Sequence, residues 1–157
     1  MKKLTRSELK NRLDKLVQTY ARYKRAFYIG DQLVATCVTC GKVYPVEGKN
    51  CIQGGHCWTR ACIPLRWKEE SVNAQCSFCN CFLHGNEREY ALWFIKVHGQ
   101  ELFDEYNQIY KEWRNGKVKP FTIQQLRQLY NSWLTTGRAL EKQFDKKIFP
   151  STWKEEL

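Results

Sequence analysis

Two Cys-x-x-Cys pairs constrain the fold of this chain more than any other feature. The first pair is Cys37 and Cys40, and the second is Cys76 and Cys79, with 35 residues between them. A structural zinc ion takes four thiolate or imidazole ligands in a tetrahedron, commonly from two tight turns. The pairs therefore predict one structural Zn²⁺ with all four cysteines as ligands. The long interval between them predicts a segment inserted between the two zinc-binding turns.

A redox-active dithiol is the alternative explanation for a Cys-x-x-Cys pair. It needs a pair placed after a strand in a βαβ unit, and this chain lacks that setting. Four further cysteines form no second pair of zinc-binding turns and are expected to be reduced thiols. They are Cys51, Cys57, Cys62 and Cys81. No stretch of about 18 apolar residues is present, and the N-terminus does not resemble a signal peptide. We therefore expect a cytoplasmic protein without disulfides and without a membrane partner.

Positive charge is concentrated toward the N-terminus. The 157 residues include 26 Lys and Arg against 16 Asp and Glu, a formal net charge of +10. Residues 1–30 hold nine basic and two acidic residues, residues 31–90 hold six of each, and residues 91–157 hold eleven and eight. Basic flanks around a neutral centre predict a polyanionic partner, with nucleic acid as the first candidate. A solvated basic helix face is the alternative.

Hydrophobic spacing divides the chain into three regions of one domain. Residues 1–30 are predicted to form a basic amphipathic helix, which starts at a Thr5-x-x-Glu8 capping box and carries Phe27 on its apolar stripe. Residues 31–99 are predicted to form a zinc-bound core of short strands and loops, followed by helices. Residues 100–157 are predicted to be helical, with a loosely packed tail from Phe144 onward. The fold class is therefore α+β.

Cap signals place the helices of the second half. One helix is predicted from the second cysteine pair to His84-Gly85, and another from Asn86 to Gly99. Asn115-Gly116 is predicted to end a third helix. Thr122, with Gln125 three residues later, is predicted to open a fourth.

The segment between and after the cysteine pairs resembles the HNH endonucleases of the ββα-metal type. The resemblance rests on Gly54-Gly55-His56 and on the run from Cys76 to Asn86. In that family, a histidine near the end of the first strand is the general base, an asparagine lies on the connecting loop, and the following helix holds a divalent ion. Many members carry two Cys-x-x-Cys pairs around this finger.

The motifs also resemble those of a narrower family, the lambda-type NinG/Rap recombination endonucleases of phages, over roughly residues 10–115. The motifs are, in chain order, Gly55-His56, Leu65-Arg66-Trp67, Gln75-Cys76-x-x-Cys79-Asn80, Gly85-Asn86 and Tyr90. This resemblance implies a zinc-stapled ββα-metal finger in a mostly helical domain. It also implies an enzyme that hydrolyses phosphodiesters of branched DNA, such as Holliday junctions and D-loops. The implied partners are DNA and phage recombination proteins, in the host cytoplasm. Because a four-way junction needs two cuts, a homodimer is plausible.

The resemblance implies a role for each candidate site residue. His56 would be the general base, since imidazole titrates near neutral pH. Asn80 and His84, at positions i and i+4 of the predicted helix, would hold a catalytic Mg²⁺ or Mn²⁺. Ser71 stands where the loop asparagine is common, and Asn73, two residues later, would take the supporting catalytic role. Gly55 occupies the position at which many members have an acidic metal ligand.

Structural alternatives stay open for these residues. His56 could cap a strand or hydrogen-bond a cysteine sulfur, and His84 could be a helix C-terminal residue stabilised by the helix dipole. Another HNH nuclease class (homing, restriction or packaging-associated nicking) is one alternative function. A non-catalytic zinc-ribbon protein that binds nucleic acid is the other, and Gly55 and Ser71 favour it.

Overall fold

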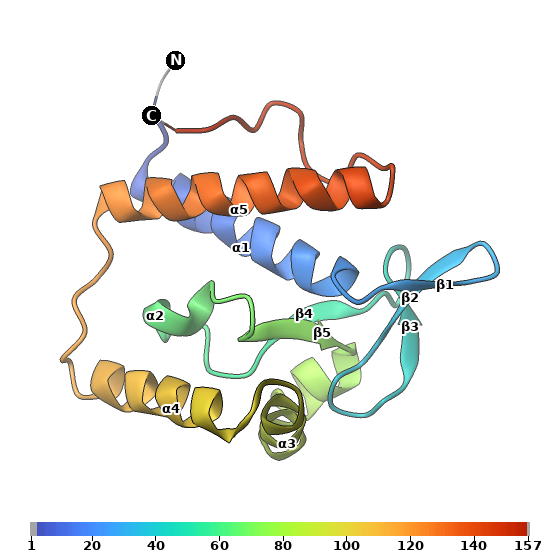
Figure 1. Cartoon of the computed structure of the whole chain (residues 1–157), viewed down its shortest axis with the longest axis horizontal. Coiled ribbons are helices and arrows are strands. Elements are labelled where there is room, and N and C mark those ends of the chain that lie inside the picture. The colour runs from blue at the N-terminus through green and yellow to red at the C-terminus, as the bar shows by residue number, and fades with distance from the viewer. Residues whose placement is uncertain (1–2, 157) are drawn as a thin grey trace.

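Two long helices, a small central strand pair and a second pair of helices form three layers (Figure 1). The structure is a computed structural model and describes residues 3–156. The helices are α1 (Arg6–Tyr23), α2 (Ile63–Arg66), the π-helix η1 (Phe78–Phe82), α3 (Glu87–His98), α4 (Gln100–Arg114) and α5 (Ile123–Gln143). The strands are β1 (Phe27–Ile29), β2 (Gln32–Thr36), β3 (Val43–Pro45), β4 (Gln53–His56) and β5 (Val72–Gln75). The result is a mixed structure of helices and small sheets.

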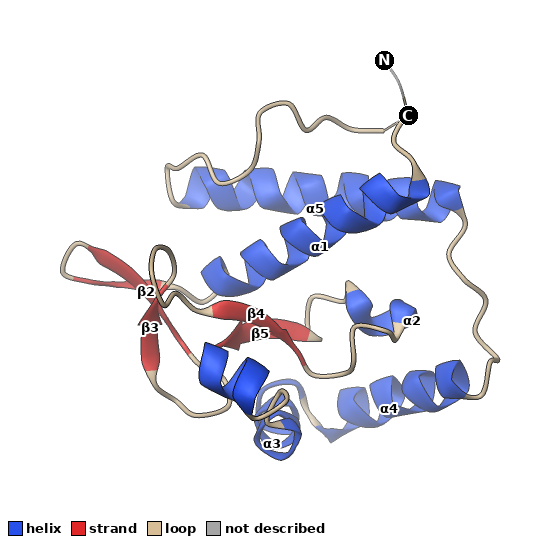
Figure 2. Ribbon diagram, turned by 180° about the vertical axis from the view of Figure 1, so that it is seen from behind, coloured by secondary structure: helices blue, strands red, loops and turns tan. Residues whose placement is uncertain are grey.

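The strands form two separate antiparallel sheets (Figure 2). One has the order β1-β2-β3, and the other consists of β4 and β5. In the second sheet, Gly55 lies opposite Asn73 and His56 lies opposite Val72. Helix α1 packs on this β4–β5 pair, and η1 follows β5 directly.

The N-terminal helix begins where the sequence predicts but ends seven residues earlier. The side chain of Thr5 accepts a hydrogen bond from the backbone N–H of Glu8, whose carboxylate accepts one from the Thr5 N–H, so the capping box is confirmed. The predicted continuation to Gly30 is wrong, because β1 and β2 form a hairpin that turns at Gly30 in a left-handed conformation. Phe27 is therefore an exposed strand residue. The run of aromatic and β-branched residues before a Gly-Asp turn favours this hairpin.

The main core lies between α1 and α5. It is built from Leu9, Leu13, Leu16 and Val17 of α1 and from Leu126, Tyr130, Trp133 and Leu134 of α5. The predicted loose tail is wrong: Phe149 is buried in this core against Gly137. Glu156 accepts a hydrogen bond from the backbone N–H of Leu4 and bonds with Asn131, which ties the two ends of the described chain together. The burial of the Phe149 ring stabilises this arrangement.

The other predicted helix ends are largely confirmed. Gly99 closes α3, and Asn115 caps the C-terminal end of α4. Thr122 and Gln125 form the capping box of α5. Asn86 precedes α3 as predicted, but its side chain makes no capping hydrogen bond. Within residues 3–156, no helix is both long and apolar enough to cross a membrane.

Candidate active site and zinc centre

The two cysteine pairs meet at one point beside the sheets. The sulfur atoms of Cys37, Cys40, Cys76 and Cys79 all lie within 4.8 Å of one another, and those of Cys40 and Cys76 are 3.9 Å apart. A tetrahedral zinc ion with bonds of about 2.3 Å separates its sulfur ligands by roughly 3.8 Å. The four residues therefore fit a structural zinc, as the sequence predicts.

Hydrogen-bond donors surround these sulfurs, as thiolate ligands require. The backbone N–H of Cys76 donates to the Cys37 sulfur at 3.3 Å, and the Asn86 amide nitrogen lies 3.8 Å from the Cys79 sulfur. Burial raises the pKa of Cys37, but hydrogen bonds from Thr39 and backbone N–H groups outweigh it and lower this pKa to about 6. Donors that stabilise the charged form lower a pKa in this way. Asn86 thus contacts the cysteine cluster instead of capping α3.

The glycines before His56 allow close packing on both faces of β4. A Cβ atom on Gly54 would lie 2.7 Å from the Cα of Gln18 in α1. A Cβ on Gly55 would lie 2.1 Å from the side-chain oxygen of Gln75 on the opposite face. Gln75 itself is fully buried, and its amide nitrogen donates to the Gly85 carbonyl at 2.6 Å. No side chain fits at position 55, so an acidic metal ligand there is excluded by packing.

Gly55→Ala is expected to destabilise the protein by about 1–3 kcal/mol, the usual cost of forcing extra volume into a packed site. Urea unfolding at neutral pH measures the effect. Gly85→Ala is not a suitable control because the Gly85 backbone has a positive φ. Ala91→Gly on α3 is the control, since it removes one methyl group where Gly55→Ala adds one. It should lower the free energy of unfolding by only about 1 kcal/mol, the difference in helix propensity between alanine and glycine. An unchanged stability of Gly55→Ala would contradict the packing argument.

His56 is the last residue of β4, and one nitrogen of its ring is engaged in a hydrogen bond. Its Nε2 lies 3.2 Å from the carbonyl oxygen of Arg66. Because a carbonyl only accepts hydrogen bonds, Nε2 carries the proton, and Nδ1 is left as the basic atom. Burial lowers the pKa of His56 to about 4, with a further contribution from Arg60. The ring is therefore neutral at pH 7.

The stability of the protein is expected to fall with acidification through His56. The unfolded chain takes up this proton near pH 6.5, whereas the folded chain does so only near pH 4. Stability is thus complete above pH 6.5 and declines toward pH 4, by up to about 3 kcal/mol at 1.4 kcal/mol per pH unit. Unfolding of wild type and His56→Gln at pH 7 and pH 4.5 measures this. If acidification lowered the stability of both proteins equally, His56 would not contribute to the pH dependence of stability.

A chain of contacts from α1 positions the Arg66 carbonyl. The Arg66 guanidinium makes two hydrogen bonds to Asp14, at 2.9 and 2.5 Å, and the Trp67 indole donates to the same carboxylate at 2.8 Å. Burial raises the pKa of Asp14, but these donors outweigh it and lower the pKa below its usual value. Asp14 was not predicted as a site residue, because the sequence shows it only as one charged residue on the predicted N-terminal helix.

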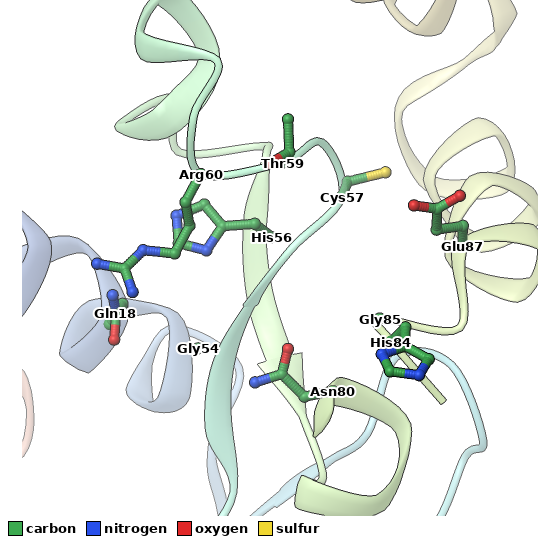
Figure 3. Close-up of a pocket in the computed structure, with 10 residues that line it drawn as sticks. All are labelled: Gln18, Gly54, His56, Cys57, Thr59, Arg60, Asn80, His84, Gly85 and Glu87. Atoms are coloured by element: carbon green, nitrogen blue, oxygen red, sulfur yellow. The ribbon is translucent and has the colours of Figure 1, made fainter. Parts of the chain in front are cut away.

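His56, Asn80 and His84 line one cavity of about 310 Å³ (Figure 3). The Asn80 amide nitrogen donates to the side-chain oxygen of Gln53 at 2.8 Å, and its own oxygen points into the cavity. The predicted helical spacing of Asn80 and His84 is wrong. Helix η1 ends at Phe82, and His84 lies beyond it in a left-handed turn. The backbone N–H of Gly85 returns to the Cys79 carbonyl, which closes this turn beside the cysteine cluster.

Asn73 does not reach the cavity. It is buried behind β4, where its amide nitrogen donates to the Tyr90 hydroxyl at 3.1 Å and to the Glu70 carbonyl at 2.7 Å. The Tyr90 hydroxyl donates in turn to the Gly55 carbonyl at 2.9 Å. Asn73 therefore supports the strand that carries His56 and cannot contact a substrate in the cavity. Ser71 is likewise buried.

Several residues that line the cavity were not predicted as site residues, among them three with charged or thiol side chains. Cys57 and Arg60 follow His56, and Glu87 begins α3. The Glu87 carboxylate points toward the cavity from the side opposite β4 (Figure 3). An acidic residue in the first turn of a helix is usually explained by the helix dipole, so the sequence carried no signal for this position beyond its nearness to His84.

Comparison with known proteins identifies the family. The sequence model of the family described as Bacteriophage Lambda NinG protein matches residues 1–143, which reach from the N-terminus to the end of α5. This match extends beyond residues 10–115 in both directions. No curated protein and no solved structure matches the chain. The match includes both cysteine pairs and every residue of the cavity, and the chain belongs to the bacteriophage lambda NinG family.

Proposed function

We propose that this chain is a metal-dependent endonuclease that hydrolyses phosphodiesters of branched DNA, such as Holliday junctions and D-loops. One observation carries the proposal: His56 is neutral, has Nδ1 as its basic atom, and shares a cavity with Asn80, His84 and Glu87. The order of β4, β5 and the helical turn η1 agrees with the ββα-metal resemblance. The net charge of +10 suits a polyanionic substrate.

His56 would act as the general base. Its Nδ1 takes a proton from a water molecule and the water oxygen attacks the phosphorus. The bond to the 3′ oxygen then breaks, and that oxygen takes a proton from solvent water. The products are a 5′ phosphate and a 3′ hydroxyl. The Arg66 carbonyl holds the ring through Nε2–H and stabilises the imidazolium that forms. A bound phosphodiester adds negative charge to the cavity, which raises the pKa of His56 toward the working pH.

The cavity also offers ligands for a catalytic divalent ion. The Asn80 oxygen, the His84 imidazole and the Glu87 carboxylate are of the types that Mg²⁺ or Mn²⁺ accepts. Such an ion would stabilise the charge on the phosphoryl group and on the leaving oxygen. Glu87 is an acidic group of the kind that cannot be placed at position 55, so the glycine at that position is compatible with the proposed catalytic ion.

The zinc centre and the basic surface of α1 would position the catalytic groups and the DNA. A zinc ion at the four cysteines would hold η1, and thus Asn80, against β4. The basic surface of α1 would hold DNA arms through their phosphates, which gives affinity without sequence preference. A homodimer would supply the two cuts that a four-way junction needs, and phage recombination proteins would be the protein partners.

A cleavage panel tests this function. Linear, nicked, flap, D-loop and four-way DNA are incubated with the protein in Mg²⁺, in Mn²⁺ and without an added divalent ion. We expect cleavage of the branched substrates in either metal and none without an added ion. Equal cleavage of linear DNA would indicate another HNH nuclease class. Binding without cleavage in both metals would instead indicate a non-catalytic zinc-ribbon protein.

A further inference from the structure

A second cavity, of about 280 Å³, extends the first along α1. Gln18, Gly54 and Asn80 line both cavities, so the two form one continuous groove between α1 and the β4–η1 segment. Figure 3 shows these three residues at the edge of the first cavity. Gly54 allows α1 and β4 to approach closely at the point where the cavities join, because a Cβ atom there would lie 2.7 Å from the Cα of Gln18.

Both ends of this groove are basic. Lys15 and Arg22 line the extension, and Arg60 lines the first cavity beside His56. Lys15 is exposed, and the described residues form no ion pair with either Lys15 or Arg22. Arg60 pairs with Asp14 at 2.9 Å, yet its side chain remains 55% exposed.

The Arg22 guanidinium is oriented by neutral oxygen atoms. It donates to the Val46 carbonyl at 3.3 Å and to the Thr19 hydroxyl at 3.4 Å. These contacts hold the group beside the groove. Glu47 lies near enough to feel its charge, but no carboxylate of the described residues forms a direct ion pair with it. Among the described residues, no aspartate or glutamate lines the extension. A fixed, unpaired guanidinium in a concave site is well suited to a phosphate.

We propose that this groove holds the strand that is cut, with phosphates on one side of the scissile bond at Lys15 and Arg22 and with Arg60 on the other side. The inference rests on the proposed function and names the residues that position its substrate. The two cavities have volumes of about 310 and 280 Å³, which is the size range of a small-ligand site and suits a short stretch of one sugar-phosphate chain.

Salt-dependent binding tests the groove without any cleavage. Binding of a four-way junction is measured without added divalent ions, so that the structural zinc is retained, at several salt concentrations for wild type, Lys15→Gln, Arg22→Gln and Arg22→Lys. Each lost phosphate contact reduces the slope of log affinity against log salt by about 0.7–0.9. We expect this reduction for both glutamine variants and its reversal in Arg22→Lys. Lys111→Gln, on the exposed surface of α4 away from the groove, is the matched control and should keep the slope within error.

A cross-link tests the path of the strand even if Arg22→Gln folds poorly. Cys51 lines the extension, and its sulfur lies 3.9 Å from the Arg22 guanidinium. The junction carries an aryl disulfide tethered to one chosen phosphate. The Cys51 thiolate attacks this disulfide, forms a new disulfide with the DNA-tethered sulfur and releases the aryl thiol. We expect the cross-link only at phosphates within a few nucleotides of the cut, and its loss in Cys51→Ser.

The outcomes separate this inference from the proposed function. The groove proposal is wrong if the salt slopes of both glutamine variants are unchanged, or if Cys51 cross-links only to phosphates remote from the cut. In either case, cleavage of branched DNA by wild type would still support the endonuclease proposal. A wild type that neither binds nor cuts branched DNA overturns both.

Discussion

His56→Ala is expected to lower metal-dependent cleavage of a four-way junction by about 100- to 10,000-fold, the contribution of a positioned general base. The methyl group cannot accept the proton of the attacking water. Folding should persist, because the Asp14 contacts to Arg66 and Trp67 do not involve the imidazole. Initial rates in Mg²⁺ and in Mn²⁺ measure the loss. Junction binding without added divalent ions should stay within about threefold of wild type, since phosphate contacts dominate affinity.

His98→Gln is the matched histidine control. His98 ends α3, packs on the rings of Trp93 and Phe94, and does not line the cavity. Its cleavage rate should therefore remain close to that of wild type. Cleavage by His56→Ala at the wild-type rate would refute the general-base assignment, whereas equal losses in both variants would point to folding as the cause.

Cys76→Ser is expected to abolish zinc binding and to unfold the centre of the protein. A structural zinc contributes apparent free energies of about 10–16 kcal/mol, which equals or exceeds the net stability of most domains, about 5–15 kcal/mol. Cys76 directly follows β5, and its backbone N–H donates to the Cys37 sulfur, so loss of the metal also releases the strand opposite His56. Metal analysis and circular dichroism of tag-free protein measure both effects.

Cys81→Ser provides the control for this experiment. Cys81 lies in the π-helix η1, two residues after the predicted ligand Cys79, but is exposed and outside the cluster. It should retain one zinc per chain and wild-type stability, and a chelator should unfold it as it unfolds wild type. A folded wild-type protein that contains no zinc after purification would rule out the structural zinc.

The capping residues and the cysteine spacing in the sequence predict most helix ends and the candidate zinc ligands correctly. The Thr5 and Thr122 capping boxes and the glycine at the end of α3 act within one turn of helix, and the structure has all three. The cysteine spacing likewise identified four residues that the fold brings together. These signals are reliable because each depends on contacts between residues close in sequence, or on a ligand set that only one arrangement satisfies.

The predictions that are wrong concern segments whose conformation is set by contacts that hydrophobic periodicity does not encode. His84 lies in a left-handed turn because the segment closes onto the Cys79 carbonyl. Phe149 is buried because Gly137 leaves room for its ring on α5. Neither partner is visible in the local hydrophobic pattern, so periodicity could not reveal them.

The sequence by itself determined the cysteine ligand set, the α+β composition, the basic character of α1 and the choice of His56 as the leading candidate base. Only the tertiary structure decided which polar groups share the cavity with that histidine: it placed Asn80, His84 and Glu87 there and moved Asn73 behind the strand. The physical reason is the packing of β4. Because Gly54 and Gly55 have no side chains, α1 and Gln75 press against opposite faces of the strand, and this contact orients His56 toward the groove.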